Sequence, residues 1–526
     1  MMNKVFMCSR PRFRRTMSGF GALSRELAGD GHLLLAPGRD ALERIGTTDW
    51  LLPALASSEP LVLTGEAIEA LWKAHSSTDP IRPAPGRVIA PILPSTNDHT
   101  TPSLGDYRIE MFPDIATDID MDLTVHYDIT GRSRTEGKID DITSLFRNRI
   151  EKLRKEILKT TPLSRPITVL QLLDQRAKYT GYDTSATIVG LVSNPRFTKA
   201  GNLLFTLEDE TASVECLITR SEEDVNDIVH VGLMPDDVIG LKGSFSRNND
   251  LFFAEEPYFP RLEVHERAHA EQGVSVAFIS DLHVGSKTFL DDQWVKMRQW
   301  FHTDPLARTI KYLILSGDVV DGIGIYPGQE NELSIPDLFN QYSHLAGLLD
   351  DFPDWVEILL LPGNHDAVRP QEPQPALEPD IQNDFNSTTF VGNPCDFSLH
   401  GVRLLSYHGK SIDDFVGTLR NVDYGCPVEA MREMMRRRHL APTWGSKTPL
   451  SPEPEDDLII GTRPDIFVTG HVHGHHCEDH KGTTLVCSST WQNQTAYQRM
   501  LGFQPKPCIL TVINLKTHAS ASIPFA

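Results

Sequence analysis

Short apolar runs that end in acidic, histidine or asparagine residues constrain this chain more than any other feature. The clearest is KYLILSGDVVDG at 311–322, in which Tyr312–Leu315 is too short for a helix but bulky enough for a buried strand. Asp318 and Asp321 follow it directly. In open α/β sheets, ligands bind just beyond the carboxyl ends of the strands. The sequence therefore predicts that Asp318 lies at the binding edge of a buried sheet.

Four other apolar runs finish in the same way. They are VSVAFIS before Asp281-Leu282-His283, VEILLLP before Gly363-Asn364-His365-Asp366, VRLLSY before His408, and DIFVTG before His471-Val472-His473. Five strands thus bring carboxylate, imidazole and amide side chains to one edge. Such mixed nitrogen and oxygen donors suit Mn²⁺, iron, Zn²⁺ or Mg²⁺. The sequence predicts a metal site at this edge.

The spacing of these donors predicts how they converge. In Asp281-x-His283 and in His471-x-His473 the two side chains would point the same way on an extended segment, toward one metal site. Asp318 is central to the set, where a carboxylate can bridge two ions about 3.5–4 Å apart, the spacing of two-metal hydrolysis. Such a centre would lower the pKa of a shared water and hold a phosphate oxygen.

Composition limits the classes of partner. The 526 residues predict two or three domains, and the formal net charge of −21 argues against binding nucleic acid by bulk charge. Binding through metals, local arginines or a basic partner stays open, and a salt-rich cytoplasm would also explain the charge. The seven cysteines are scattered and lack C-x-x-C spacing. This distribution is typical of reduced thiols. No stretch approaches the ~18–20 apolar residues of a membrane span. We therefore expect a cytoplasmic, nucleoid-associated protein.

The sequence pattern divides the chain into four parts. Residues 1–75 predict a small helical module, and the proline-rich and acidic residues 76–139 predict a flexible linker. Residues 140–265 predict an amphipathic helix over 140–159, followed by short strands and turns that suit an OB-type Greek-key barrel. In residues 272–526 strands alternate with helical patterns. We expect this last domain to be an α/β sheet sandwich with flanking helices.

Several side chains allow two interpretations. The barrel phenylalanines can stack on bases, but they are more often core residues or contacts to a protein partner: Phe197, Phe205, Phe245, Phe252 and Phe253. Arg432 and Arg436–Arg438 would hold phosphates or form a solvated face, with Met431, Met434 and Met435 in the core. We expect His475 and His476 to face solvent or a substrate channel.

The metal-site motifs resemble, in order and spacing, those of the calcineurin-like metallophosphoesterase superfamily. The resemblance runs from about residue 272 to the end. It implies that one metal ion takes Asp281, His283, Asp318 and His473, and that the other takes Asp318, Asn364, His408 and His471. It also implies that His365 is not a ligand, but stabilises the transition state and protonates the leaving oxygen. Asp321 and Asp366 would either orient ligands or serve as loop and cap residues.

Four further stretches resemble the small subunit of archaeal D-family DNA polymerase: GNHDAVRPQEPQPAL, SYHGKSIDD, RRRHLAPTWGSKTPLSPEPEDDL and WQNQTAYQRMLGFQPKP. In that family a phosphoesterase domain follows an OB domain and a weakly ordered N-terminal region. The resemblance covers residues 140–526 well, and residues 1–140 only by layout. The related B-subunits of eukaryotic replicative polymerases have lost the metal ligands, whereas every ligand position is filled here.

This resemblance implies a 3′-to-5′ exonuclease that acts in DNA replication and proofreads for a large catalytic polymerase subunit. The implied cofactors are two divalent ions, Mn²⁺ first, with Mg²⁺ or other divalent ions as alternatives. The implied partners are that large subunit, in a heterodimer or higher heteromer, and DNA.

Three alternatives to the exonuclease remain: a non-catalytic polymerase scaffold, a nuclease of double-strand-break repair, and a phosphomonoesterase. Many Ser/Thr phosphatases of the superfamily carry arginine directly after the second aspartate of the G-D-x-x-D block, whereas Gly322 stands there in this chain. This difference weakens the phosphatase interpretation. A repair nuclease would not explain the barrel or the four further stretches.

Overall fold

The structure is a computed structural model, and it describes residues 33–34, 62–63 and 116–526, except 164, 182–183, 220–231, 247–249, 264–265 and 501–502. The chain divides into two units, Met1–Asp98 and His99–Ala526. Of the first unit the structure describes only β1 (Leu33–Leu34) and β2 (Val62–Leu63), which pair in parallel. The helical module predicted for residues 1–75 otherwise lies outside the described residues.

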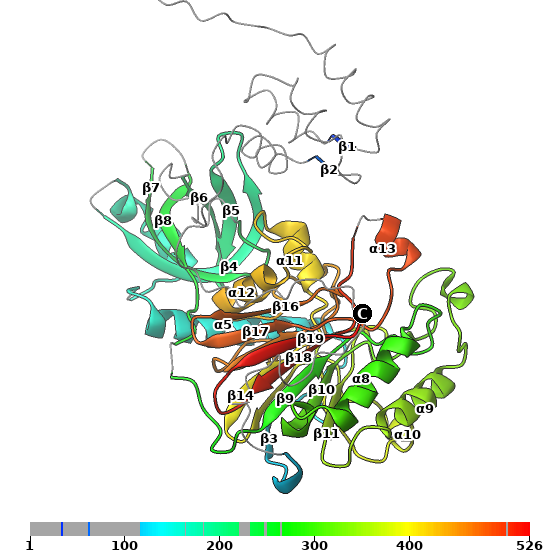
Figure 1. The fold of residues 1–526 in the computed structure, drawn as a ribbon. Helices are drawn as coiled ribbons and strands as arrows, with labels where there is room; N and C mark the ends of the chain where they lie inside the picture. The colour runs from blue at the N-terminus through cyan, green and yellow to red at the C-terminus, as the bar shows by residue number, and fades with distance from the viewer. Residues whose placement is uncertain are drawn as a thin grey trace, which may run out of the picture. The chain divides into compact units, whose positions relative to one another are not determined.

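The second unit contains a closed five-stranded barrel. Its strands are β4 (Ala186–Phe197), β5 (Leu203–Glu208), β6 (Ser213–Ile218), β7 (Val238–Phe245) and β8 (Phe252–Tyr258). They close in the order β4-β5-β6-β8-β7, with β6 parallel to β8 and the other pairs antiparallel (Figure 1). This Greek-key order confirms the predicted OB-type barrel.

A long amphipathic helix, α5 (Ile139–Thr160), precedes the barrel and confirms the helix predicted over 140–159. Its apolar stripe packs on β4 and β7, because Leu153 and Ile157 share a cluster with Val189 and Val238. Short α6 (Val169–Asp174) begins at Thr168, whose hydroxyl accepts a hydrogen bond from the Gln171 N–H.

Two six-stranded sheets form the last domain. The first has the order β12-β11-β10-β9-β18-β19, in which the first four strands are parallel. Its strands are β12 (Thr388–Phe390), β11 (Glu357–Leu361), β10 (Ile310–Ser316), β9 (Ser275–Ile279), β18 (Ile509–Asn514) and β19 (Ser520–Pro524). The second sheet has the order β16-β17-β15-β14-β13-β3. Its strands are β16 (His476–His480), β17 (Thr483–Cys487), β15 (Ile466–Thr469), β14 (Val402–Ser406), β13 (Cys395–Leu399) and β3 (Leu123–Tyr127).

The two sheets pack face to face, and helices cover their outer faces, as predicted. Strand β10 is buried along its whole length, because Tyr312 and Ile314 enter the core between the sheets while Leu313 and Leu315 pack under helices. Helices α8 (Asp291–Thr303) and α9 (Leu338–Leu349) cover the first sheet, and α10 (Pro379–Gln382) lies near them (Figure 1). Short α13 (Ala496–Met500) follows β17. In the described part of the chain, no helix is both long and apolar enough to span a membrane.

Strand β3 corrects the part of the predicted linker (residues 76–139) that the structure describes, and residues 76–115 lie outside the described residues. It is the edge strand of the second sheet, antiparallel to β13, with Leu123 opposite Leu399. The residues after it are also fixed, since Asp128 accepts the Gly392 N–H at 2.9 Å and Glu453 accepts the Arg134 N–H at 2.9 Å. No side chain of β3 is fully buried. The strand is held mainly by backbone pairing, and its alternation LTVHY is only five residues long and follows an acidic stretch, so the sequence did not mark it as a strand.

The barrel and the second sheet share one apolar core through α11 (Ile412–Thr418) and α12 (Val428–Arg437). At its edge, the buried Arg437 of α12 donates from Nε to Oδ2 of Asp237 in the barrel at 3.1 Å. The same guanidinium also donates to Glu433 and to the Gly232 carbonyl. The arginine thus compensates the charge of a buried barrel carboxylate.

Arg437→Met is expected to destabilise the chain by about 3–5 kcal/mol, because Asp237 would stay buried without its cation. Burial already raises the pKa of Asp237 to about 6, despite Arg437. Without Arg437 the folded chain takes up a proton there more readily than the unfolded chain, so the loss should shrink as the pH falls toward 5. Urea unfolding at pH 5 and pH 8 measures both effects.

Arg432→Met on the same helix is the matched control, because Arg432 pairs with Glu429 and Glu478 at a partly exposed site. Loss of such a pair is expected to cost at most about 1 kcal/mol. Equal destabilisation by the two variants would show that Arg437 does not stabilise the contact with the barrel.

Candidate metal centre

The seven predicted ligands lie directly after five strands, three from the first sheet and two from the second. The strand ends meet where Ser316 Oγ of β10 lies 3.1 Å from Ser406 Oγ of β14. Five of the seven are buried: Asp281, His283, Asp318, His408 and His473. Asn364 and His471 are half-buried. The donors therefore lie below the surface, at the junction of the two sheets, where the low dielectric strengthens their electrostatic interactions.

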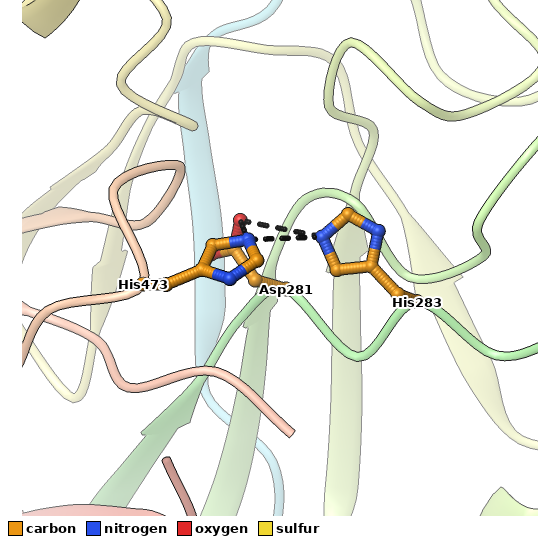
Figure 2. Close-up of side chains that lie close together, drawn as sticks. All are labelled: Asp281, His283 and His473. Carbon is orange, nitrogen blue, oxygen red and sulfur yellow. Dashed lines mark hydrogen bonds and ion pairs between the residues drawn. The ribbon is translucent and has the colours of Figure 1, made fainter. Parts of the chain in front are cut away.

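Asp281, His283 and His473 form the first donor cluster (Figure 2). The Nε2 atoms of the two histidines lie 3.1 Å apart, and Asp281 Oδ1 lies 3.4 Å from Nε2 of His473. This Oδ1 atom is buried and has no hydrogen-bond partner among the described residues. Burial alone would raise the pKa of Asp281, but His473 and His408 hold it below its ordinary value. An unsatisfied carboxylate oxygen that faces two imidazole nitrogens fits a metal ion.

Asp318, Asn364, His408 and His471 form the second donor cluster. Nε2 of His408 lies 3.3 Å from Asp318 Oδ2 and 3.2 Å from Asn364 Oδ1. Nδ1 of His408 lies 2.9 Å from the Ser316 carbonyl oxygen, which can only accept, so Nδ1 carries the proton. The lone pair of Nε2 is thereby presented to the cluster, as is typical of metal-binding histidines.

Asp318 lies between the two clusters. Its ligand atoms come within 4.8 Å of those of His408 and His471 on one side, and of those of His283 and His365 on the other. Burial alone would raise the pKa of Asp318, yet His408 and His365 hold it well below its ordinary value. An ionised carboxylate between two groups of donors is suited to bridge two cations.

Five of the predicted ligands have left-handed backbone conformations: Asp281 (φ 52°), His283 (φ 52°), Asp318 (φ 50°), His471 (φ 67°) and His473 (φ 50°). The expectation of extended segments was therefore wrong. Asp281 and His283 still converge, but His473 turns to Asp281 whereas His471 turns to the second cluster. Non-glycine residues adopt this conformation at a cost of about 1–2 kcal/mol each. The surrounding loops must hold these residues in place.

Glycine permits the loops to approach closely at the second cluster. A Cβ atom at Gly363 would lie 2.2 Å from Asp318 Oδ1, and one at Gly317 would lie 2.5 Å from His408 Nδ1. Neither position has room for a side chain. The glycines of the G-D and G-N-H motifs thus allow the ligands beside them to meet.

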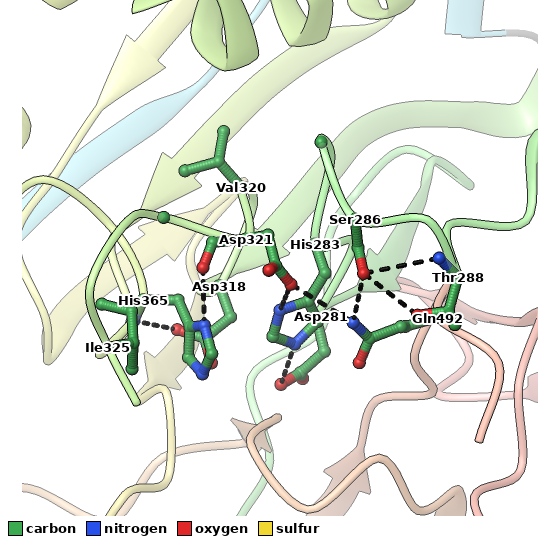
Figure 3. Close-up of polar contacts among 12 residues, drawn as sticks. Asp281, His283, Ser286, Thr288, Asp318, Val320, Asp321, Ile325, His365 and Gln492 are labelled. Carbon is green, nitrogen blue, oxygen red and sulfur yellow. Dashed lines mark hydrogen bonds and ion pairs between the residues drawn. The ribbon is translucent and has the colours of Figure 1, made fainter. Parts of the chain in front are cut away.

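Asp321 contacts the ligand His283 (Figure 3). Its Oδ1 lies 3.3 Å from Nδ1 of His283, while Gln329 donates to its Oδ2 at 3.0 Å and Gln492 to its Oδ1 at 3.3 Å. A carboxylate held on one side and in contact with a ligand ring on the other fixes the orientation of that ring. This geometry favours the orienting interpretation of Asp321.

Asp366 is buried and contacts backbone. It accepts the Gly363 N–H at 2.7 Å and the Val319 and Val320 N–H groups at 3.3 and 3.4 Å, so it joins the loop of Asp318 to the loop of Asn364. Burial and the charge of Asp318 raise the pKa of Asp366 to about 7. These contacts favour the loop-and-cap interpretation.

His365 stands beside both clusters (Figure 3). Its backbone N–H donates to Asp318 Oδ1 at 2.8 Å, and its Nδ1 lies 2.8 Å from the Asp321 carbonyl oxygen. Nδ1 is thus the donor, and Nε2 is the ring atom left for chemistry. The ring meets the edge of the His283 ring at 4.7 Å between centroids. A ring nitrogen of His365 also lies within 4.8 Å of a donor atom of His283 and of a donor atom of Asp318. His365 could therefore bind a metal ion instead of acting on the leaving group.

Comparison with known proteins identifies the family. The family of the B-subunits of DNA polymerases alpha and epsilon matches residues 276–477. The DNA polymerase II small subunit of Halobacterium salinarum is 35% identical, over 88% of this chain and 90% of its own length. The corresponding protein of Methanocaldococcus jannaschii is 37% identical, over 76% and 68%. This chain belongs to the family of archaeal DNA polymerase II small subunits.

Two further comparisons were found. The DNA polymerase II small subunit of Thermoplasma acidophilum is 39% identical over 73% of this chain and 78% of its own length. A solved structure titled as a novel archaeal phosphodiesterase covers 48% of this chain and 99% of its own, at 11% identity and a TM-score of 0.24. That score supports no structural conclusion.

Sequence reasoning missed two residues that contact the ligands of this small subunit. Asp413 in α11 lies 3.2 Å from His471 Nε2, and it also accepts from Lys410 Nζ at 2.9 Å and from the Tyr424 hydroxyl at 2.8 Å. Gln498 in α13 lies 2.9 Å from Nδ1 of His473. The stretches SYHGKSIDD and WQNQTAYQRMLGFQPKP contain these residues, and were the only signal of them in the sequence.

Several of the residues with two interpretations make structural contacts in this small subunit. Arg432 and Arg437 form ion pairs with carboxylates, so the arginines form neither a phosphate site nor a simple solvated face. The three methionines of α12 are buried, as predicted. Three barrel phenylalanines are buried: Phe205, Phe245 and Phe252. The Arg420 guanidinium lies over the Phe197 ring at 3.3 Å from its centroid.

Proposed function

We propose that this small subunit is a metal-dependent 3′-to-5′ exonuclease that proofreads for a large D-family polymerase subunit. The observation that carries the proposal is the complete set of predicted ligands, five of the seven buried, in two adjoining clusters around Asp318. A scaffold without catalysis would not need a buried carboxylate oxygen left without a partner, nor five ligands in left-handed backbone conformations.

The ligand sets implied by the resemblance fit this geometry. One ion would be held by Asp281, His283, Asp318 and His473, and the other by Asp318, Asn364, His408 and His471. When bound, two divalent ions, Mn²⁺ first, would supply an activated water and neutralise charge on the phosphodiester. Asp321 and Gln498 would keep the rings of His283 and His473 in orientation.

His365 is proposed to act on the leaving group. The Asp321 carbonyl fixes the proton on Nδ1, so that Nε2 can carry a second proton toward the site. This proton would pass to the 3′ oxygen that leaves when the terminal nucleotide is removed. The bond from its own backbone N–H to Asp318 ties the position of His365 to that of the central carboxylate.

Gly322 disfavours a phosphomonoesterase. It has a φ of 75°, and a Cβ atom there would lie 2.3 Å from the His365 carbonyl oxygen. The backbone therefore has no room for the arginine that many Ser/Thr phosphatases of the superfamily carry at this position. The phosphate must therefore be bound by groups other than that arginine. This suits a phosphodiesterase, whose substrate extends beyond the scissile phosphate and can be held by further contacts.

The proposed partner is the large polymerase subunit, with DNA held between the two chains. A net charge of −21 suits this chain poorly for holding DNA alone, because phosphate contacts dominate affinity. Co-expression with the large subunit is expected to give one peak in size-exclusion chromatography, DNA synthesis, and faster removal of a mismatched primer end than the isolated chain achieves.

Primer extension from a mismatched end measures this effect, and the matched control is the same complex with Asp318→Asn. That complex should still elute as one species and extend a paired primer, but should not remove the mismatch. Separate elution of the two chains, or mismatch removal that survives Asp318→Asn, would contradict the proposal.

A further inference from the structure

A surface pocket of about 380 Å³ opens beside the metal centre. It is lined mainly by Tyr424, Pro427, Gly474, His475, Phe503 and Lys506. Its volume lies at the small end of the range for ligand sites. The rings of Tyr424 and Phe503 meet edge to face, with 6.2 Å between their centroids and 73° between their planes. The pocket therefore combines two aromatic rings with one lysine residue.

The pocket is connected to both donor clusters by direct contacts. On one side the Tyr424 hydroxyl donates to Asp413, and the other oxygen of that carboxylate lies 3.2 Å from His471. On the other side the backbone N–H of Lys506 donates to the His473 carbonyl at 2.9 Å. A group bound in the pocket thus lies one residue away from ligands of both clusters.

Phe503 is held in this position through the same residues that contact the metal ligands. Its N–H donates to the Gln498 carbonyl at 2.9 Å, and its carbonyl accepts from the Gln494 side chain at 2.7 Å. Gln498 in turn contacts His473. The aromatic ring is therefore built into the loop that orients a ligand, which argues for a role in substrate binding rather than for a stray surface residue.

We propose that this pocket binds the base of the terminal nucleotide at an unpaired DNA 3′ end. This inference rests on the proposed exonuclease function, since it names the part of the substrate that lies beside the scissile phosphate. Aromatic side chains bind bases by stacking, whatever their sequence. Lys506 also lines the pocket, and its side chain would approach the phosphate backbone.

The pocket gives a physical reason for preferring mismatched ends. A base can enter it only after leaving the duplex stack, and this costs least for a base that is mismatched or already single-stranded. The pocket would thus favour unpaired ends before any chemistry takes place. Substrates with a fully paired 3′ end would have to fray first.

The test compares two single-stranded oligonucleotides that differ only at the 3′ terminus, one with a normal terminal nucleotide and the other with an abasic one. With the full chain, the normal oligonucleotide is expected to bind about 5- to 100-fold more tightly than the abasic one. In the Phe503→Ala variant the two should bind alike. Fluorescence anisotropy in EDTA measures the ratio of the two binding affinities without hydrolysis. The ratio of the two kcat/KM values with Mn²⁺ measures the preference for the normal oligonucleotide during turnover.

Phe339→Ala is the matched control, because Phe339 is an exposed phenylalanine of α9, outside the pocket. It should keep the full discrimination between the two oligonucleotides. Lys506→Gln, at an exposed position, should instead weaken both oligonucleotides and lower the salt slope of binding by about one. Unchanged discrimination in Phe503→Ala would overturn the proposal.

The two proposals fail in different ways. If the chain with Mn²⁺ hydrolyses neither oligonucleotide, the exonuclease proposal fails, while the anisotropy ratio still decides whether the pocket binds a base. If hydrolysis is normal but the abasic end is cleaved as fast as the normal end, the pocket proposal alone fails. Loss of co-elution with the large subunit in Phe503→Ala, with discrimination intact, would assign the pocket to a protein contact instead.

Discussion

Asp318→Asn is expected to lower Mn²⁺-dependent exonuclease activity by at least about 10³-fold, because bound metal ions supply several kcal/mol of transition-state stabilisation. Asparagine keeps the shape of the buried side chain and can still accept the His365 N–H, so the fold should be preserved. What it loses is the negative charge between the two clusters. Degradation of a 3′-labelled single strand measures activity, and elemental analysis of the purified chain measures metal content.

The metal content should fall below two ions per chain in this variant and stay unchanged in Asp292→Asn. Asp292 is exposed in the first turn of α8, so Asp292→Asn removes one carboxylate charge outside the site and is the matched control. Hydrolysis by Asp318→Asn at the rate of the control would show that no bridging carboxylate takes part in the reaction.

His365→Gln is expected to lower turnover by about 10²–10⁴-fold, the contribution typical of general acid–base groups. The substitution leaves the backbone N–H bond to Asp318 in place, so the central carboxylate should keep its position. Metal content should remain near that of the unaltered chain. Single-turnover kinetics and metal analysis on the same preparation distinguish a proton donor from a metal ligand, the two roles that the geometry of His365 allows.

His344→Gln, at an exposed position of α9, is the matched histidine control and should leave both quantities unchanged. Loss of an ion together with activity in His365→Gln would make His365 a ligand. Loss of neither would remove His365 from the reaction altogether.

The sequence predicted which donor side chains the structure brings together at the strand ends, because that signal is local. A parallel strand buried on both faces is a short apolar run, and the ligands follow each run within a few residues. The barrel and α5 were predictable for the same reason, since turns and a helical apolar stripe are also local patterns. In each case the residues that decide the structure are neighbours in the chain.

Features that depend on contacts between distant segments could not be predicted. Strand β3 is held by the backbone of β13, which lies far away in the sequence, and its short alternation LTVHY did not by itself indicate a strand. Asp413 belongs to the site only because α11 packs where it does. The left-handed conformations at the ligands leave no trace in residue type, since aspartate and histidine also occur in extended segments. The role of Arg437 likewise needed the position of the barrel.

The core shared by the barrel, α11, α12 and the second sheet means that the boundary near residue 265 separates two topologies but not two folding units. A chain starting at residue 272 would expose the apolar faces of α11 and α12 to water, and would leave Arg437 and Glu433 without Asp237. Truncation should therefore give an aggregating polypeptide rather than a minimal nuclease. The same coupling restricts substitution in α12, because each new side chain must suit the barrel and the second sheet at once.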